Sequence, residues 1–180
     1  MQRQKRLCVF CGSRTGAPPI YSEQTRLLGA ALARRGVGLV FGAGHIGLMG
    51  VLADAVRKGS GETIGVIPQS LVDRELAHQQ LTKLHIVESM HDRKALMAEL
   101  SDAFLALPGG YGTLDELFEI LTWAQLRFHA KPIGMLNVAG FFDPLLTWMD
   151  RAISDDFVKS KSRELLIVDT DVDRLLDQIL

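Results

Sequence analysis

The chain has 180 residues, enough for one compact domain that buries most of its unfolded surface without disulfide or metal staples. Its formal net charge of −1 argues against a nucleic-acid polymer or an anionic membrane as a partner. The basic start leads into an apolar stretch, residues 7–10, too short for a signal peptide, and no run approaches the ~20 apolar residues of a membrane helix. We therefore expect a single-domain, cytoplasmic protein.

Strand and helix patterns alternate along the chain. Continuous apolar runs predict buried strands, and apolar residues at helical spacing predict the helices between them. The predicted elements are, in order, a strand at 6–11, a helix at 22–35, a strand at 37–41, a helix marked by Leu48, Val51, Leu52 and Ala55, strands at 63–67 and 84–87, a helix at 92–101, a strand at 103–107, a helix at 113–128, a strand at 132–136, a helix at 142–153, a strand at 166–168 and a helix at 171–180.

This alternation is typical of an α/β protein. Strands that are apolar throughout are expected where helices cover both faces of a parallel sheet. We therefore predict a Rossmann-like, doubly wound parallel sheet in three α-β-α layers, with ligands bound outside the carboxyl ends of the strands. Residues 69–80 have no clear periodicity, and connections of that length in compact domains are often functional.

Cys8 and Cys11 form a C-x-x-C motif, which elsewhere marks redox pairs or half of a zinc site. Here the motif lies in a predicted strand, where three residues span about 10 Å and the two side chains point to opposite faces. A disulfide needs Cα atoms within about 7 Å. Two reduced cysteines are therefore expected.

The strongest local motif is Pro108-Gly109-Gly110-Tyr111-Gly112-Thr113, between a buried strand and the longest predicted helix. Glycines let backbone N–H groups close on a ligand, and a helix N-terminus favours a phosphate. The motif lacks the lysine and the spacing of a Walker loop, which argues against nucleoside triphosphate hydrolysis. It predicts an anion site.

A second glycine-rich loop contains Gly42, Gly44 and Gly47, which fit the G-x-G-x-x-G pattern of dinucleotide sites. The acidic residue expected about 20 positions later is matched only by Glu62, which precedes the next strand instead of following it. We interpret this loop as a second wall of a nucleotide pocket.

The charged residues near these loops have structural as well as functional interpretations. Thr113 and Glu116 have the spacing of a capping box, and Asp115 suits the first turn of a helix. Arg93 is either a solvated charge or, because cations are disfavoured at a helix start, the partner of an anion. His91 and the other histidines lack metal-ligand spacing. A last set is expected to pack in the core or an interface: Met90, Met97, Trp123 and Trp148.

Two longer motifs, Met90-His91-Asp92-Arg93-Lys94-Ala95 and Pro108-Gly109-Gly110-Tyr111-Gly112-Thr113-Leu114-Asp115-Glu116, resemble the paired signature of the Lonely Guy phosphoribohydrolases, long mislabelled as lysine decarboxylases. The resemblance extends over nearly the whole chain. Further matching segments are residues 9–13, 47–50, 65–68, 101–104 and 131–134.

The resemblance implies a Rossmann-like homodimer that hydrolyses cytokinin riboside 5′-monophosphates, and often adenosine 5′-monophosphate, without metal or organic cofactor. Arg93 and Glu116 would form the catalytic pair, and Gly109, Gly110, Gly112 and Thr113 would hold the phosphate. The remaining expected substrate-binding residues are Ser13, Gly44, Glu75, Lys94, Tyr111, Leu114, Asp115 and Thr122. The helix at 113–128, with its aromatic residues, is the expected dimer surface.

The chain departs from the family pattern twice. Asp115-Glu116 replaces the usual Glu-Glu, which leaves the catalytic glutamate intact. Gly42-Ala43-Gly44 replaces a triple glycine, and the added methyl group is expected near the nucleotide wall.

The catalytic hypothesis places the phosphate on the glycine-loop amides and the anomeric carbon near Glu116, whose carboxylate stabilises an oxocarbenium-like transition state. A non-catalytic nucleotide sensor would use the same phosphate loop, and fold alone does not separate the two. The pairing of Arg93 with Glu116 favours the enzyme. A lysine decarboxylase would require a Schiff-base lysine for pyridoxal phosphate, and the sequence identifies none.

Overall fold

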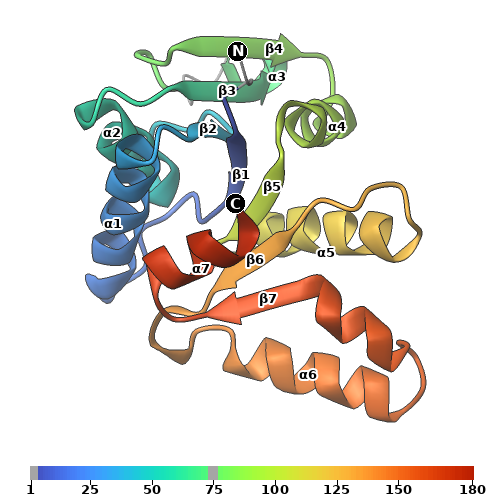
Figure 1. Ribbon diagram of the computed structural model, residues 1–180. Coiled ribbons are helices and arrows are strands. Elements are labelled where there is room, and N and C mark those ends of the chain that lie inside the picture. Colours follow the sequence, from blue (N-terminus) through green and yellow to red (C-terminus); the bar gives the residue numbers. More distant parts are fainter. Residues whose placement is uncertain (1–3, 73–76) are drawn as a thin grey trace.

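The computed structural model describes residues 4–72 and 77–180 and contains a seven-stranded sheet (Figure 1). The strand order is β4-β3-β2-β1-β5-β6-β7, and each neighbouring pair is parallel. The strands are β1 (Arg6–Phe10), β2 (Gly38–Phe41), β3 (Thr63–Pro68), β4 (Lys83–Val87), β5 (Ala103–Ala106), β6 (Ile133–Leu136) and β7 (Leu166–Asp169).

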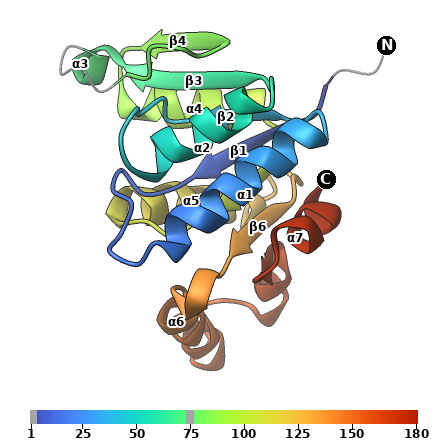
Figure 2. The ribbon, with the colours of Figure 1, turned by 90° about the vertical axis from the view of Figure 1, so that its left-hand side faces the viewer.

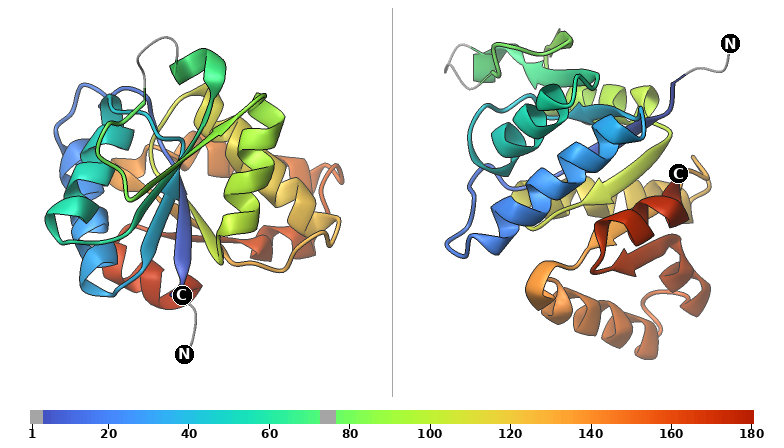
Figure 3. Two further views of the ribbon diagram at one scale, coloured as in Figure 1. Left: turned by 90° about the horizontal axis from the view of Figure 1, so that it is seen from above. Right: turned by 60° about the vertical axis from the view of Figure 1, so that its left-hand side comes forward.

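Helices cover both faces of this sheet. The α-helices are α1 (Ile20–Arg34), α2 (Gly47–Lys58), α3 (Gln69–Val72), α4 (Met90–Leu100), α5 (Tyr111–Gln125), α6 (Asp143–Ser154) and α7 (Val172–Ile179), and short 3-10 turns cover η1 (Val138–Gly140) and η2 (Ser160–Leu165). Viewed nearly edge-on, the strands run between α1, α2 and α7 on one side and α4, α5 and α6 on the other (Figure 3). The predicted Rossmann-like, three-layer arrangement is confirmed. In the described part of the chain, no helix is long and apolar enough to cross a bilayer.

The core consists of one apolar cluster on each face of the sheet, and β1 shows why. Leu7 and Val9 belong to the cluster under α1 and α2, whereas Cys8 and Phe10 belong to the cluster under α4 and α5. Because side chains alternate along a strand, a run that is apolar throughout serves both layers. Figure 2 shows α1 and α2 lying over one face of the central strands.

The C-x-x-C motif follows the same alternation. Cys8 and Cys11 are both buried and free, and they lie in the two different clusters on opposite faces of the sheet. Burial, the largest influence, raises the pKa of both thiols well above the ordinary value. The expectation of two reduced cysteines is confirmed by this separation.

Several helix boundaries differ from the predicted ones. Helix α4 begins at Met90 and not at 92, because the Ser89 hydroxyl accepts a hydrogen bond of 3.1 Å from the Asp92 amide and caps the helix. Residues 69–80, predicted to be irregular, contain the short helix α3 and an isolated bridge between Gly44 and Ala77. Helix α5 begins at Tyr111, two residues before the predicted start.

The chain changes winding direction between β1 and β5. From β1 it continues through α1 to β2 on one side, and from β5 through α5 to β6 on the other. In doubly wound sheets such a switch point opens a crevice at the carboxyl ends of the strands. The loops after β1, β2 and β5 converge there.

Candidate active site

The three loops are joined by backbone hydrogen bonds. The Gly12 amide donates to the Pro108 carbonyl at 3.1 Å, and the Leu48 amide donates to the Gly12 carbonyl at 3.0 Å. The loop after β1 is therefore fixed to the glycine-rich loop after β5 and to the start of α2. The crevice at the switch point has a rigid backbone.

Two glycines permit this close approach. A Cβ on Gly109 would lie 2.0 Å from the Thr113 hydroxyl oxygen and 2.9 Å from the Gly12 nitrogen. Gly47 has a φ of +65°, and a Cβ there would lie 2.2 Å from the Ser13 carbonyl carbon. Any larger residue at either position requires the loops to separate.

The N-terminus of α5 is not closed by a side chain. Gly110 is the N-cap residue and no side chain accepts a hydrogen bond at this cap, so the predicted capping box of Thr113 and Glu116 is wrong. Thr113 is already the third helical residue and is buried against Gly109. The first amides of α5 have no intrahelical acceptor, which leaves them for an anion.

A cavity of about 320 Å³ lies at this point, within the roughly 300–1,000 Å³ usual for small-molecule sites. Eight predicted site residues line it: Ser13, Arg93, Gly110, Tyr111, Gly112, Thr113, Asp115 and Glu116. They come from the loops after β1 and β5 and from α4 and α5. The structure therefore brings together the two motifs that the sequence separates.

Arg93 reaches the cavity from α4 and is 8% exposed. Its Nε donates to the Val66 carbonyl at 3.1 Å and its Nη2 to the Gly42 carbonyl at 3.1 Å, while Nη1 lies 3.6 Å from the Met90 sulfur. The interpretation of Arg93 as a solvated charge is wrong. Backbone carbonyls of β3 and of the loop after β2 fix the plane of the guanidinium, and further N–H groups on Nη1 and Nη2 remain for a ligand.

Glu116 lines the same cavity and has an unusual proton affinity. Burial raises the pKa of its carboxyl group to about 7, and the positive charge of Arg93 opposes this rise. A carboxylate beside an arginine in a desolvated cavity is a common arrangement for a group that exchanges protons near neutral pH. The cavity therefore combines an anion site with a tuned acid.

Lys94 on α4 and Asp115 on α5 form an ion pair between the two helices. Lys94 Nζ lies 3.0 Å from Asp115 Oδ2 and 3.1 Å from Glu119 Oε1. Asp115 is the fifth residue of α5, beyond the first turn, so the lysine and not the helix dipole accounts for its position. Lys94 is not among the residues that line the cavity.

The remaining predicted residues lie around the cavity and not on its wall. Gly109 packs against Thr113, Gly44 contacts the side chain of Met49, and Leu114 packs against the core. Thr122 donates to the Phe118 carbonyl at 2.7 Å and faces a groove between α5 and α6. Glu75 lies outside the described residues.

Four lining residues had no predicted role in the site, namely Val9, Cys11, Met49 and Met90, whereas Gly42 belongs to the loop that was expected to form a second wall. Gly42 stands out in the sequence because it directly follows a strand. The requirement for glycine at this position, however, comes from a residue that is distant in the sequence. A Cβ at Gly42 would lie 1.7 Å from Arg93 Nη2, so the arginine requires glycine there. Met90 was expected to pack, yet it is 44% exposed and borders Arg93.

The Ala43 methyl group does not lie on the nucleotide wall as expected. Ala43 is fully buried with a φ of 60°, and it packs with Ile67 and Ala77 in a small separate cluster. Its carbonyl accepts a hydrogen bond of 2.7 Å from the His78 amide. The substitution therefore affects the packing of residues 77–81 against the loop after β2.

Glu62, the acid of the incomplete dinucleotide motif, has a structural partner. Its two oxygens accept hydrogen bonds of 3.0 Å from Arg6 Nε and Nη2. It precedes β3, at the amino end of the sheet, away from the glycine loop. Of the three glycines interpreted as a second wall of the pocket, Gly42 lines the cavity and Gly44 and Gly47 do not.

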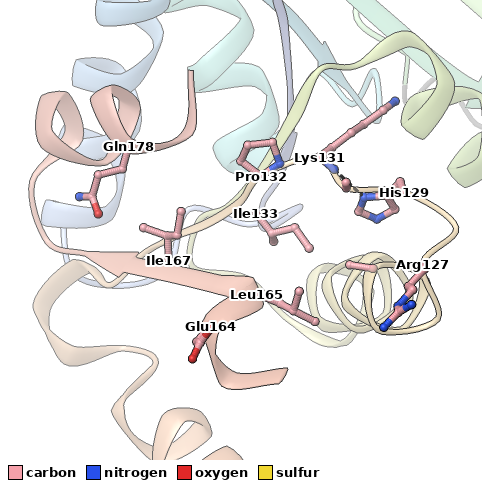
Figure 4. A pocket seen from close by; sticks show the side chains of 11 residues that line it. Arg127, His129, Lys131, Pro132, Ile133, Glu164, Leu165, Ile167 and Gln178 are labelled. Atoms are coloured by element: carbon pink, nitrogen blue, oxygen red, sulfur yellow. Dashed lines mark hydrogen bonds between the residues drawn. The ribbon is translucent and has the colours of Figure 1, made fainter. Parts of the chain in front are cut away.

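A second cavity, of about 640 Å³, lies at the amino ends of β6 and β7 (Figure 4). Two of its polar side chains are already bound to the fold, since Lys131 Nζ donates to the Ala98 carbonyl at 2.7 Å and His129 Nε2 bonds the Ile120 carbonyl at 3.0 Å. No glycine-rich loop borders it. The smaller cavity at the switch point is therefore the candidate active site.

The chain is similar to proteins of a known family. Residues 49–179 match a family model described as "possible lysine decarboxylase". The chain is 49% identical over 165 residues to the cytokinin riboside 5′-monophosphate phosphoribohydrolase LOG of Oryza sativa subsp. japonica, covering 92% of this chain and 68% of that protein. It is 45% identical over 177 residues to the phosphoribohydrolase LOG7 of Arabidopsis thaliana, covering 98% of this chain and 82% of that protein.

Among solved structures, a molybdenum cofactor binding protein from Rippkaea orientalis superimposes with a TM-score of 0.75. It is 21% identical and covers 99% of this chain and 97% of its own. At this identity the likeness shows a common fold.

Proposed function

The chain belongs to the family of cytokinin riboside 5′-monophosphate phosphoribohydrolases, and from this membership we propose that it hydrolyses the N-glycosidic bond of a purine nucleoside 5′-monophosphate. The products are the free base and ribose 5-phosphate. The observation that carries the proposal is that Arg93 and Glu116 line one cavity together with the uncapped N-terminus of α5.

The phosphate is proposed to bind the first amides of α5. Gly110, Gly112 and Thr113 line the cavity at the point where the partial positive charge of the helix is concentrated. Binding at this point fixes the ribose beside the turn of α5 that carries Glu116. Holding the sugar in place removes the entropic cost of bringing it to the catalytic group during the reaction.

Glu116 is proposed to act on the anomeric carbon. As the C–N bond stretches, positive charge grows on the ribose, and the ionised carboxylate stabilises it. The attacking water adds its oxygen to the anomeric carbon and gives a proton to Glu116, which returns this proton to the departing purine nitrogen. A pKa of about 7 suits a group that both accepts and returns a proton near neutral pH.

Arg93 is proposed to orient the substrate and to hold the negative charge of Glu116 in place. Its guanidinium is fixed by two carbonyls before any ligand arrives, so little reorganisation is needed during reaction. Charge-assisted hydrogen bonds from a fixed guanidinium are both strong and directional.

The proposal is tested by chromatography after separate incubation with adenosine 5′-monophosphate, isopentenyladenosine 5′-monophosphate and the two unphosphorylated nucleosides. Release of free base from the monophosphates alone is the expected result, and their relative rates identify the preferred base. Tight nucleotide binding without release of base would instead indicate a sensor, in which Glu116 has no chemical task. A lysine decarboxylase is disfavoured because no lysine is among the described residues that line the cavity.

We further propose that the protein works as a single catalytic domain in the cytoplasm and forms a homodimer. Two buried free cysteines suit a reducing compartment. Exposed apolar residues on and near α5 and α6 support self-association, among them Leu126, Phe128 and Trp148. Light scattering should give twice the chain mass, and Trp148→Glu should shift it toward the monomer; a wild-type monomer at micromolar concentration would contradict the dimer.

A further inference from the structure

Ala43, in the loop after β2, has a backbone conformation that alanine rarely adopts. Its φ is 60°, in the left-handed region, and the residue is fully buried. A residue other than glycine keeps such a conformation only where its surroundings hold it there. The preceding residue, Gly42, supplies the carbonyl that binds Arg93 Nη2 at 3.1 Å. The contacts that hold Ala43 therefore also hold an atom that orients the arginine of the candidate active site.

Residues 77–80 hold this loop through backbone contacts. The His78 amide donates to the Ala43 carbonyl at 2.7 Å, and Gly44 forms an isolated antiparallel bridge with Ala77. The Ala43 methyl group packs with Ala77 in a small apolar cluster. A shift of residues 77–80 would therefore be transmitted to the loop after β2.

The His78 side chain fixes this segment to α2. Its ring is buried, and both ring nitrogens have partners. The Gln80 amide donates to Nδ1 at 3.2 Å, which places the ring proton on Nε2, and Nε2 lies 3.1 Å from Asp54 Oδ1. Asp54 belongs to α2, and its side chain is 66% exposed. His78 is not among the described residues that line the cavity, so an effect of its ring on the site must pass through neighbouring residues.

We propose that His78 is a positioning residue for Arg93. Held by Asp54, its ring fixes residues 77–80 against the loop after β2 and so keeps the Gly42 carbonyl where it binds the guanidinium. The consequence for catalysis rests on the proposed function, in which a fixed Arg93 orients the substrate. The orientation of Arg93 is itself a property of the folded protein and can be measured without turnover.

The direct test is an NMR measurement of the Arg93 guanidinium in protein labelled with ¹⁵N-arginine, with the signals assigned from Arg93→Lys. A guanidinium held by two carbonyls rotates slowly about its Nε–Cζ bond, so Nη1 and Nη2 give separate signals. In His78→Phe the exchange rate between these signals should rise at least about tenfold, because the charged hydrogen bond to Gly42 loosens. The Nε signal should keep its shift, since its acceptor Val66 lies on β3. An unchanged exchange rate would overturn the proposal.

His129→Phe is the matched control. His129 lines the cavity at the amino ends of β6 and β7, and its ring is held in the same way (Figure 4). Its Nδ1 accepts from the Lys131 amide at 3.1 Å, and its Nε2 bonds the Ile120 carbonyl at 3.0 Å. This variant loses a similar pair of hydrogen bonds and should leave the Arg93 signals as in wild type. An equal rise of the exchange rate in both variants would mean that the His78 ring matters only for general stability, and would overturn the proposal.

Variants at the exposed end of the contact keep the test valid if His78→Phe folds poorly. Asp54→Leu removes the acceptor of Nε2–H and should raise the exchange rate in the same direction. Asp54→Asn keeps an accepting oxygen and should stay close to wild type. Arg57→Met removes the other partner of Asp54, whose Nη1 lies 3.4 Å from Oδ1, and should leave the rate unchanged. A wild-type rate in folded Asp54→Leu would overturn the link from Asp54 through His78 to the loop.

Kinetics separate positioning from a general loss of stability. At a temperature at which all variants are folded, His78→Phe should lower kcat/KM by about three- to tenfold, since small displacements of an orienting group slow a reaction. The double variant with Arg93→Lys should be no slower than Arg93→Lys alone, because both changes remove the same contact with Gly42. Additive losses would show that His78 acts by another route and overturn the inference. Faster exchange of the Arg93 signals in a protein that releases no base would instead refute the proposed hydrolysis and leave the positioning role standing.

Discussion

The two ends of the sheet each carry a cavity, and the larger one is the less suited to chemistry. At the amino ends of β6 and β7, Lys131 and His129 use their side-chain nitrogens to hold carbonyls of the fold. At the carboxyl ends of β1, β2 and β5, a cavity about half that volume holds a fixed guanidinium, a desolvated acid and the open start of a helix. Size alone therefore does not locate a site; the disposition of charge does.

The largest expected effect comes from Glu116→Gln. The amide keeps the shape but not the charge of the side chain, so turnover should fall at least about a hundredfold while nucleotide binding changes little. Steady-state rates and calorimetric binding of ribose 5-phosphate measure the two quantities. Glu164→Gln, at the amino-end cavity, is the matched control and should keep wild-type turnover. Near-normal turnover in Glu116→Gln would refute the catalytic assignment.

Arg93→Lys should have the next largest effect. Lysine keeps the charge but lacks the planar geometry that joins the Val66 and Gly42 carbonyls, so kcat/KM should fall by about ten- to a hundredfold. Arg127→Lys, an exposed residue at the amino-end cavity, should leave the rate unchanged. Equal rates for both variants and the wild type would mean that only the charge at position 93 matters.

The pH dependence should follow Glu116. Because burial raises the pKa of Glu116 to about 7, the ionised form is lost as pH falls through this value, and kcat/KM should drop about tenfold per pH unit below it and level off above. The same shift weakens folding as pH rises from 4.5 to about 7, since the folded state holds its proton longer than the unfolded chain. Glu116→Gln should therefore gain stability relative to wild type at pH 8. A rate that rises toward acid pH would assign Glu116 the role of general acid.

The smallest expected effects concern the backbone of the carboxyl-end site. Gly109→Ala places a methyl group against Thr113 and Gly12 and should lower the free energy of unfolding by about 1–3 kcal/mol. Gly112→Ala meets no atom within 4 Å and should raise that free energy by about 0.5–1 kcal/mol, because alanine favours the helix. Urea denaturation measures both. Equal stability of the two variants would show that the loops separate freely.

Most of the fold could be predicted from the sequence. The spacing and content of apolar residues identify the seven strands and the main helices. The signal is strongest for the central strands β1, β2 and β5, which serve both core clusters and must be apolar throughout. Boundaries were less accurate where a cap decides them. Ser89 and Gly110, and not the hydrophobic periodicity, determine where α4 and α5 begin.

The candidate site was predictable where its residues lie in contiguous motifs. The loop at 108–113 and the pair Arg93 and Glu116 were found because glycines and charges stand out at strand and helix ends. The role of Met49, and the requirement for glycine at position 42, could not be predicted, because both depend on contacts with residues distant in sequence. The opposite error was made with Ala43, whose methyl group points into a cluster that no local pattern reveals.

The hydrogen bonds of Arg93 to Val66 and Gly42 bear on how this site can be transplanted. The arginine lies on α4, but the two carbonyls that orient it lie on β3 and in the loop after β2. A chimaera joined between β3 and α4 would take Arg93 and Glu116 from one parent and the segments that carry the two carbonyls from the other. Recombination between relatives should therefore impair activity when the crossover falls between β3 and α4.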